Sequence, residues 1–425
     1  KPKLALIPSG YADDKVFSVL PSNGDGDFDF SRGTTATRLN AQGLIETVSS
    51  NVPRLNYPLI DGVVSGCPSL LLEPQRTNLI TYSEDFSQTS FWNANSNVTI
   101  LKNYKSPNGT LNASKIIPNT TNSQHSIKAT GQLTNSRYNY TIYVKASGNS
   151  FFQIANQSTT DYVNFNLNNG TYFASNSNDE VSVDYFGDGW YKCNVYFATT
   201  FQGIYNVIID NIGSTRLEGF VGNDVDGIYI WGAQAEQSSY PTSYIPTNGQ
   251  SGGVTRSAET CNNSGDANTF NDSEGVLMAE ISAFSNSGNG QIRINEQGVL
   301  NSVIMEFRDS GTTLRTYIFD GNATNQFFSE TNINPNDNIK IALKYKKNDC
   351  SLYLNGFVKA TDTIATMPSN LNSLSFDQGD GSNPFRGNTK QIQYFDTALT
   401  DIDLEQLTSW DSFRDMAIAQ QYTII

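Results

Sequence analysis

The sequence has little charge and almost no histidine. Asp, Glu, Lys and Arg make up 16% of its 425 residues, below the roughly 25% of an average globular protein, and His125 is the single histidine. The net charge is −14, and no run of Lys or Arg occurs. Nucleic acid would find no basic surface to bind, and an anionic membrane would repel the chain. We therefore expect neither a nucleic-acid partner nor a membrane partner.

Long apolar runs are also absent. No stretch approaches the ~20 apolar residues of a membrane-spanning helix, and Lys1-Pro2-Lys3 leads into no signal-peptide core. The four cysteines, Cys67, Cys193, Cys261 and Cys350, lie far apart without CxxC spacing. This spacing argues against a disulfide framework and against a zinc site, so we expect buried free thiols.

The residues of nucleophilic catalysis are missing too. A Ser/His or Cys/His pair needs an imidazole, and His125 lies in the polar run NSQHSIK, where we expect a solvated side chain. No GxSxG elbow occurs, and no glycine-rich loop is followed by the Lys-Ser/Thr of a phosphate-binding loop. We therefore expect a non-enzymatic protein.

Aromatic residues and strand patterns are abundant. The chain holds 24 Phe, 21 Tyr and 4 Trp, and in Gly227–Ala233 the residues Ile228, Ile230 and Gly232 alternate with Tyr229, Trp231 and Ala233. Such a pattern predicts a buried strand. Pro241 and Pro246, followed by Gly249, Gly252 and Gly253, then end the regular structure. We place a linker at 248–257.

The sequence therefore predicts an all-β protein with three parts. Residues 1–77 form an extended lead-in, where prolines 53, 58, 68 and 74 prevent long elements. Residues 78–247 form a jelly-roll sandwich with one solvated face, since Tyr140, Ile142 and Val144 alternate with Thr141, Tyr143 and Lys145. Residues 258–425 form a second sandwich with a C-terminal helical segment.

Two local structures of this second sandwich can be predicted in detail. Strands at 338–349 and 350–362 form a hairpin, and Asn355-Gly356 makes a tight turn. Thr400 caps a short helix with Asp403 at the capping-box position, while Ile402 and Leu407 face inward. A second short helix is expected around Ser412–Ala419.

Three pieces of sequence carry a family resemblance. The run SRGTTATRLNAQGLIETVSSNVPRLNY with CPSLLLEPQRTNLITYSEDFS resembles a segment of many bacteriophage tail and virion proteins. GDGWYKCNVYF followed by GIYIWGAQAEQSSYPTSYIPTNG resembles the end of their carbohydrate-binding-like domain. YLNG and FRGNTKQIQYFDTALTDIDLEQLT are similar to the closing strands and helix of their concanavalin A-like (laminin-G-like) domains.

This resemblance implies a virion structural protein, such as a fibre, appendage or decoration protein, with lectin-like folds. Its lead-in would contact other virion proteins, its sandwiches would attach to host-surface glycan or protein, and it would assemble as a homotrimer. Rings stacked on sugars would come from Tyr143, Tyr162, Tyr196 or Tyr229, whereas Trp190 and Trp231 are assigned to packing. A structural calcium would be held by Asp85 or Glu84 together with Asp226.

Three alternatives stay open. A glycan depolymerase would need two carboxyl groups roughly 5–10 Å apart, for which Glu280, Glu306 and Asp309 are the candidates. A decoration protein would have no ligand at all. A cellular adhesin would carry a signal peptide upstream of Lys1.

Overall fold

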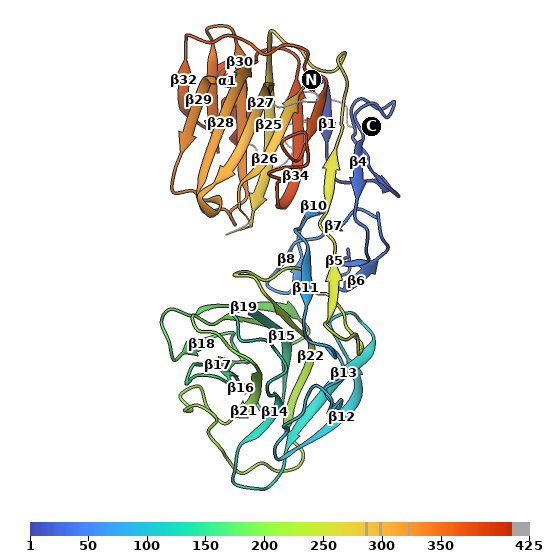
Figure 1. Cartoon of the computed structure of the whole chain (residues 1–425), viewed down its shortest axis with the longest axis vertical. Coiled ribbons are helices and arrows are strands. Elements are labelled where there is room, and N and C mark those ends of the chain that lie inside the picture. Colours follow the sequence, from blue (N-terminus) through green and yellow to red (C-terminus); the bar gives the residue numbers. More distant parts are fainter. Residues whose placement is uncertain (285–287, 297–299, 322–323, 410–425) are drawn as a thin grey trace.

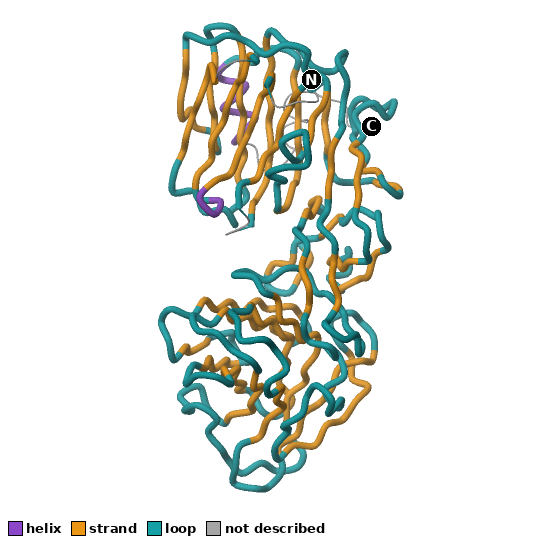
Figure 2. Tube along the Cα trace, in the orientation of Figure 1, coloured by secondary structure: helices purple, strands orange, loops and turns teal. Residues whose placement is uncertain are grey.

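The protein is built from two antiparallel β-sandwiches. The computed structural model describes residues 1–284, 288–296, 300–321 and 324–409, and the helix predicted around 412–419 lies outside them. Figures 1 and 2 show the two sandwiches at opposite ends of an elongated molecule, with the lead-in running along one side. The all-β prediction is confirmed. Among the described residues, no helix has both the length and the apolar character needed to cross a bilayer.

Residues 78–247 form the jelly-roll sandwich, which has two sheets. The strands of the first are, in spatial order, β12 (Val98–Lys105), β13 (Leu111–Pro118), β22 (Gly227–Glu236), β15 (Asn139–Ser147), β20 (Trp190–Tyr196) and β19 (Glu180–Gly187). Those of the second are β14 (His125–Ala129), β21 (Ile204–Ile209), β16 (Phe151–Asn156), β17 (Tyr162–Asn166) and β18 (Tyr172–Ala174). Alternate residues such as Tyr140, Ile142 and Val144 fill the core between them, as the period-2 pattern predicts.

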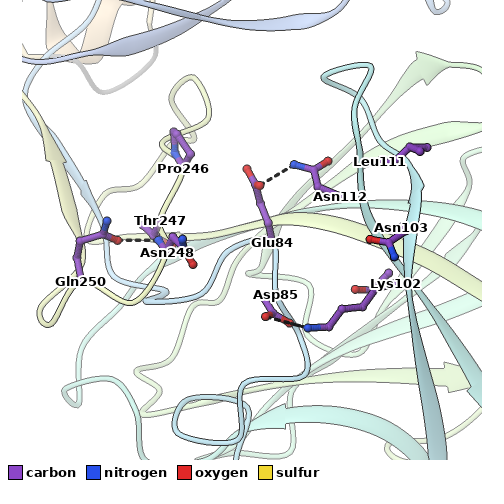
Figure 3. Close-up of a pocket in the computed structure, with 11 residues that line it drawn as sticks. Glu84, Asp85, Lys102, Asn103, Leu111, Asn112, Pro246, Thr247, Asn248 and Gln250 are labelled. Carbon is purple, nitrogen blue, oxygen red and sulfur yellow. Dashed lines mark hydrogen bonds and ion pairs between the residues drawn. The ribbon is translucent and has the colours of Figure 1, made fainter.

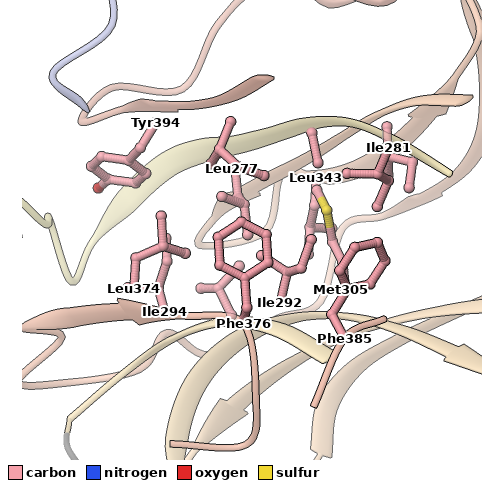
Figure 4. Close-up of a cluster of buried hydrophobic side chains, with 14 of the residues drawn as sticks. Leu277, Ile281, Ile292, Ile294, Met305, Leu343, Leu374, Phe376, Phe385 and Tyr394 are labelled. Carbon is pink, nitrogen blue, oxygen red and sulfur yellow. The ribbon is translucent and has the colours of Figure 1, made fainter. Parts of the chain in front are cut away.

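The C-terminal sandwich also has two sheets. The larger contains β32 (Phe357–Asp362), β31 (Cys350–Leu354), β30 (Ile339–Lys346), β25 (Glu274–Ala283), β34 (Gly387–Phe395), β10 (Ser69–Leu72), β7 (Leu55–Asn56) and, beside β34, β1 (Leu4–Leu6). The smaller contains β29 (Thr324–Glu330), β28 (Thr313–Asp320), β27 (Asn301–Arg308), β26 (Gly290–Asn295) and β33 (Ser373–Ser375). Their facing side chains interlock in one core (Figure 4).

The lead-in is folded into this sandwich. Leu4–Leu6 of β1 and Leu70–Leu72 of β10 both pair with β34, so they extend the larger sheet. Their side chains share the core with Leu277 and Tyr394. The extended lead-in therefore supplies strands to the larger sheet and does not lie free on the surface.

Shorter elements connect the two sandwiches. They are β2 (Tyr11–Ala12), β3 (Lys15–Val16), β4 (Phe28–Ser31) and β24 (Thr260–Asn262) in one sheet, and the pairs β5 (Ala36–Leu39) with β6 (Ile45–Val48), β8 (Leu59–Ile60) with β9 (Val63–Val64), and β11 (Arg76–Asn78) with β23 (Val254–Arg256). The predicted linker thus contains a paired strand. Tyr240 also stacks on Phe284 of the C-terminal sandwich, with ring centroids 5.7 Å apart.

A buried ion cluster lies at this junction. Arg54 pairs with Glu73 at 2.7 Å, Arg256 pairs with Glu73 at 2.8 Å, and Arg32 pairs with Glu259 at 2.8 Å. The three arginine side chains are 0% exposed. The cluster joins the lead-in to the segments that leave the jelly roll and enter the C-terminal sandwich.

The predicted hairpin and turn are confirmed, because β30 pairs with β31 and both Asn355 (φ 49°) and Gly356 (φ 83°) have left-handed backbones. The helix α1 (Asp401–Ser409) follows the last strand, β34. A short 3-10 helix, η1 (Asp309–Gly311), lies between β27 and β28. The capping box is also present: Asp403 N donates to Thr400 Oγ1 at 3.2 Å, and Thr400 N donates to Asp403 Oδ2 at 3.3 Å. The inward-facing pair is Leu404 and Leu407, however, and Ile402 is 68% exposed, so that detail of the prediction was wrong.

The solvated face predicted for the jelly roll is covered around Tyr143. Tyr143 is 5% exposed and packs in an aromatic cluster with Trp190, Trp231 and Tyr244, over which Ile45 of the β5–β6 hairpin lies. Gly232, with φ 65°, lies within an irregularity of the β15–β22 pairing, and beyond it Ala233 joins the core that Ile228 and Ile230 occupy. Beyond the bulge, the residues that face the core are therefore the ones that a simple alternation would place on the outer face.

Candidate functional site

A polar pocket of about 480 Å³ opens on the jelly-roll sandwich where β12 and β13 meet two connecting segments. This volume is within the range of small-molecule sites. Its wall consists of Glu84, Asp85, Lys102, Asn103, Leu111, Asn112, Ser114, Pro246, Thr247, Asn248 and Gln250. Figure 3 shows the two carboxylates between the strand residues on one side and residues 246–250 on the other.

Backbone contacts of Ser83 fix the position of the acidic pair. Ala233 N donates to the Ser83 carbonyl at 2.9 Å, so this segment lies along β22. Ser83 N donates to Thr247 Oγ1 at 2.9 Å, and Thr247 N donates to Ser83 Oγ at 2.9 Å. Because these bonds hold the two connecting segments together, Glu84 and Asp85 project from a fixed backbone.

Glu84 is held by two donors. Tyr244 Oη donates to its Oε1 at 2.9 Å. Asn112 Nδ2 donates to its Oε2 at 2.6 Å, and Figure 3 shows this second bond. Burial raises the pKa of Glu84 above its ordinary value, although these hydrogen bonds oppose the rise. The pocket thus contains a positioned carboxyl group that gains a proton more readily than a solvated one.

The pKa of Asp85 is shifted in the opposite direction to that of Glu84. Burial alone would raise its pKa, but hydrogen bonds from Lys102, Gln88 and Ser87 outweigh burial and lower the pKa to about 2. Lys102 Nζ lies 2.8 Å from Asp85 Oδ1. This pair is ionised and neutral overall, and the amides of the pocket wall surround it.

The four predicted tyrosines do not form one platform, and none lines the pocket. Tyr143 is buried against Phe186 and Trp231, with ring centroids 5.1 and 5.4 Å away, so it cannot stack on a sugar. Tyr229 belongs to the same cluster and packs on Tyr104 at 4.9 Å. As predicted, Trp190 and Trp231 are packing residues.

The other two tyrosines lie elsewhere. Tyr162, on β17 of the second sheet, is half-buried beside Phe173, with ring centroids 6.2 Å apart. Tyr196, at the end of β20, lies under the Arg137 guanidinium at 4.1 Å. Sequence reasoning missed Asn112 and Tyr244, since no local pattern marks residues that meet only in the folded chain.

Asp85 and Asp226 do not meet at one calcium site. Ser83 lies beside Ala233, whereas Asp226 precedes β22, roughly 20 Å away along the strand. Asp226 accepts a hydrogen bond from Asn223 at 2.7 Å. Within the described ranges, no group of three or more His, Cys, Asp or Glu side chains could hold a metal ion. The predicted pair therefore does not fit the six to eight oxygen ligands of calcium.

Glu280 and Glu306, two of the carboxylates considered for hydrolysis, do not pair either. Glu280 lies on the outer face of the larger C-terminal sheet, because its neighbours Ala279 and Ile281 face the core. Glu306 lies on the outer face of the smaller sheet for the same reason, and Asp309 is exposed. Packed sheets are separated by ~10 Å, so Glu280 and Glu306 cannot flank one glycosidic bond.

Two single-residue expectations were wrong. His125 is buried, and its ring nitrogens lie 2.8 Å from the carbonyl oxygens of Asn97 and Phe220, because β14 carries it inward. Cys67 is exposed, while Cys193, Cys261 and Cys350 are buried free thiols as expected.

No protein-family model matches the sequence, and no curated protein matches it. Similar solved structures do exist. The CBM40 domain of Ruminococcus gnavus IT-sialidase, bound to α2,3-sialyllactose, is 16% identical, with 35% of this chain and 93% of that chain covered and a TM-score of 0.30. The heptameric SAP-like pentraxin of Limulus polyphemus is 14% identical over 33% of this chain and 72% of its own, with a TM-score of 0.28.

Domains LG4-5 of the mouse laminin α1 chain are 13% identical, with 78% of this chain and 92% of that chain covered and a TM-score of 0.23. All these proteins are far from this chain in sequence. A likeness at such identities concerns fold alone.

Proposed function

We propose that this chain is a non-enzymatic glycan-binding protein that holds an uncharged, hydroxyl-rich sugar in the pocket of the jelly-roll sandwich. The observation that carries the proposal is the Glu84 carboxyl group, half-buried in the pocket and aligned by Tyr244 and Asn112. Carboxyl and amide groups fixed in this way can accept and donate hydrogen bonds to vicinal hydroxyls.

The charges in the pocket support an uncharged ligand. Asp85 and Lys102 neutralise each other, so Glu84 is the remaining charged group among the lining residues. An anionic sugar would meet Glu84 without a free cation to compensate. Asn103, Asn248 and Gln250 instead offer uncharged donors and acceptors.

The direct test is a titration of neutral oligosaccharides against the whole chain and against Glu84→Gln and Asn112→Ala. Loss of a hydrogen bond to a charged group is worth about 1.5–3 kcal/mol, so each variant should bind at least tenfold more weakly. Glu180→Gln, which removes an exposed carboxylate from β19, is the matched control and should bind normally. Equal binding by Glu84→Gln, with an unchanged melting temperature, would overturn the proposal.

We also propose the finer role of a virion protein that attaches to a host-surface glycan and contacts other virion proteins as a homotrimer. The support is the sequence resemblance of the lead-in, together with apolar residues that it leaves exposed: Ile60 (60%) and Val63 (67%) on the β8–β9 hairpin. Immunogold labelling of purified particles tests the location, and light scattering tests the trimer. Absence of label from particles, or a monomeric mass, would contradict the corresponding part.

One observation favours a decoration protein without a ligand. The β5–β6 hairpin covers part of the outer face of the six-stranded sheet, as the aromatic cluster shows. Residues 212–217 cover part of the other outer face, where Asn164 Nδ2 donates to the Ser214 carbonyl at 2.7 Å and Gln153 Nε2 donates to the Thr215 carbonyl at 3.0 Å. A flat response on a broad glycan array, with the protein present on particles, would support this second function.

A further inference from the structure

A second pocket, of about 330 Å³, lies on the C-terminal sandwich and plays no part in the function proposed above. It opens on the outer face of the larger sheet, beside the end of α1. Its lining includes Glu280, Asn338, Lys340, Asn355, Lys390 and Thr408.

Strand register brings the charged residues together. Glu280 of β25 stands opposite Lys340 of β30 on one side and opposite Gln391 of β34 on the other. A register shift in the β25–β34 pairing follows Glu280, and there Lys390 comes to the same pocket. Alternate residues of both strands, including Ile341 and Ile281, face the core, so the charged side chains lie on the outer face.

The Glu280 carboxylate is already bound by three side chains other than Lys340. Its Oε1 accepts from Asn338 Nδ2 at 2.7 Å and lies 3.6 Å from Lys390 Nζ, and its Oε2 accepts from Gln391 Nε2 at 2.6 Å. Its side chain is 4% exposed. The carboxylate is therefore saturated with donors and serves as a fixed part of the wall.

Lys340 differs from its neighbour Lys344. Lys340 is 9% exposed, yet among the described residues no carboxylate lies within ion-pair distance of its ammonium, and the ammonium donates no hydrogen bond to them. Lys344, four residues further along β30 and on the same face, pairs with Asp349 at 2.7 Å and with Asp401 at 3.2 Å. Lys340 lines the pocket, so its ammonium is open to an anion that enters the pocket. The pocket thus has one cation whose partner is not supplied by the described chain.

We propose that this pocket binds the carboxylate of an acidic sugar residue, such as a uronic or sialic acid. The Lys340 and Lys390 ammonium groups hold the carboxylate, and the amides of Asn338 and Asn355 contact ring hydroxyls. Two lysines against one saturated carboxylate leave the pocket net positive. A volume near the lower end of ligand sites suits a single sugar residue.

The test is a calorimetric titration of the whole chain with glucuronate, N-acetylneuraminate, glucose and inorganic phosphate. At least one acidic sugar should bind, glucose should not bind at this pocket, and the affinity should fall as salt rises. Lys340→Gln should weaken acidic-sugar binding at least tenfold. Lys346→Gln, which removes the same charge from an exposed pair with Glu274, should bind like the parent.

Folding is checked in the same samples. Lys340→Gln removes a cation without a described partner, so its melting temperature should equal or exceed that of the parent, and acidic sugar should raise the melting temperature of the parent alone. Equal acidic-sugar binding by Lys340→Gln and the parent would overturn the proposal, as would phosphate binding as tight as that of the sugars. Glu84→Gln should leave this binding unchanged, so the two pockets can fail separately.

Discussion

Arg54 and Glu259, which are 205 residues apart in sequence, form a buried ion pair at the junction of the two sandwiches, with Arg54 Nε donating to Glu259 Oε1 at 2.8 Å. Arg54 Nη1 also donates to Glu73 Oε2 at 2.7 Å and to the Thr37 carbonyl at 3.0 Å. One guanidinium therefore connects the β5–β6 hairpin to the segments on both sides of the junction. Its planar array of donors is suited to this, and a lysine could not replace it.

Removal of Arg54 should destabilise the whole chain. In Arg54→Met, the Glu73 and Glu259 carboxylates lose a cation while they stay buried, and breaking a buried pair in this way typically costs about 3–5 kcal/mol. Denaturant unfolding followed by fluorescence measures the loss. Lys346→Met, which breaks the exposed pair with Glu274, should cost about 0–1 kcal/mol. Similar losses in the two variants would mean that the cluster does not stabilise the junction.

The cluster should also make stability depend on pH. Burial alone would raise the pKa of Glu73, but the charges of Arg256 and Arg54 and the Ser243 hydrogen bonds outweigh it and lower the pKa from 4.5 to about 2. A carboxyl group with a depressed folded-state pKa stabilises the protein above its unfolded pKa, and this contribution is lost as the pH falls from 4.5 towards 2.

The measurement compares the parent with Glu73→Gln across this range. The variant should be less stable at pH 7, and the difference in free energy of unfolding should shrink as the pH falls, because a protonated Glu73 resembles glutamine. Glu84, whose pKa is raised by burial, is present in both proteins and cancels. A gap that stays constant from pH 7 to pH 2 would show that the ionised form of Glu73 has no special role.

Two adjacent glycines give a matched test of backbone packing. Gly252 (φ 79°) and Gly253 (φ 86°) both have left-handed backbones, where a side chain costs about 1–2 kcal/mol. A Cβ on Gly252 would meet nothing within 4 Å, whereas one on Gly253 would lie 2.0 Å from the Asn78 carbonyl oxygen. Gly253→Ala should therefore lose clearly more stability than Gly252→Ala in thermal unfolding. Equal losses would place the cost in the backbone angle alone.

Local elements of this fold could be predicted because their signals lie close together in the sequence. The turn at Asn355-Gly356 and the capping box at Thr400 depend on residues at most three apart, and both are present. The place of the lead-in could not be predicted, because Leu71 pairs with Asn388 and no local pattern encodes that register. The bulge at Gly232 could not be predicted either. A single residue with positive φ changes which side chains of the strand face the core, and the composition of the strand does not reveal it.

The candidate site, too, could be predicted from the sequence only in part. The sequence marks Asp85 and Glu84 only as possible calcium ligands near the first jelly-roll strand, and the structure places them in a polar pocket instead. Their partners Asn112, Tyr244 and Lys102 come from three other segments, so only the fold reveals the pocket. Tyr143 has a strand pattern typical of an outward residue, and the hairpin that covers it is almost 100 residues away in sequence.

The packing of the β5–β6 hairpin on this aromatic cluster leads to a final prediction. Ile45, 8% exposed, packs on the cluster of Tyr143, Trp190 and Trp231, and its backbone N donates to the Pro107 carbonyl at 3.1 Å. Ile45→Asp places a charge against this aromatic face, which should separate the β5–β6 hairpin from the sheet and expose both tryptophans. Acrylamide quenching of tryptophan fluorescence should then increase, with a red-shifted emission maximum. Ile60→Asp, at a position 60% exposed, should leave both signals unchanged. Unchanged quenching in Ile45→Asp would mean that the hairpin is held by its other contacts, above all the Arg54 bond to the Thr37 carbonyl.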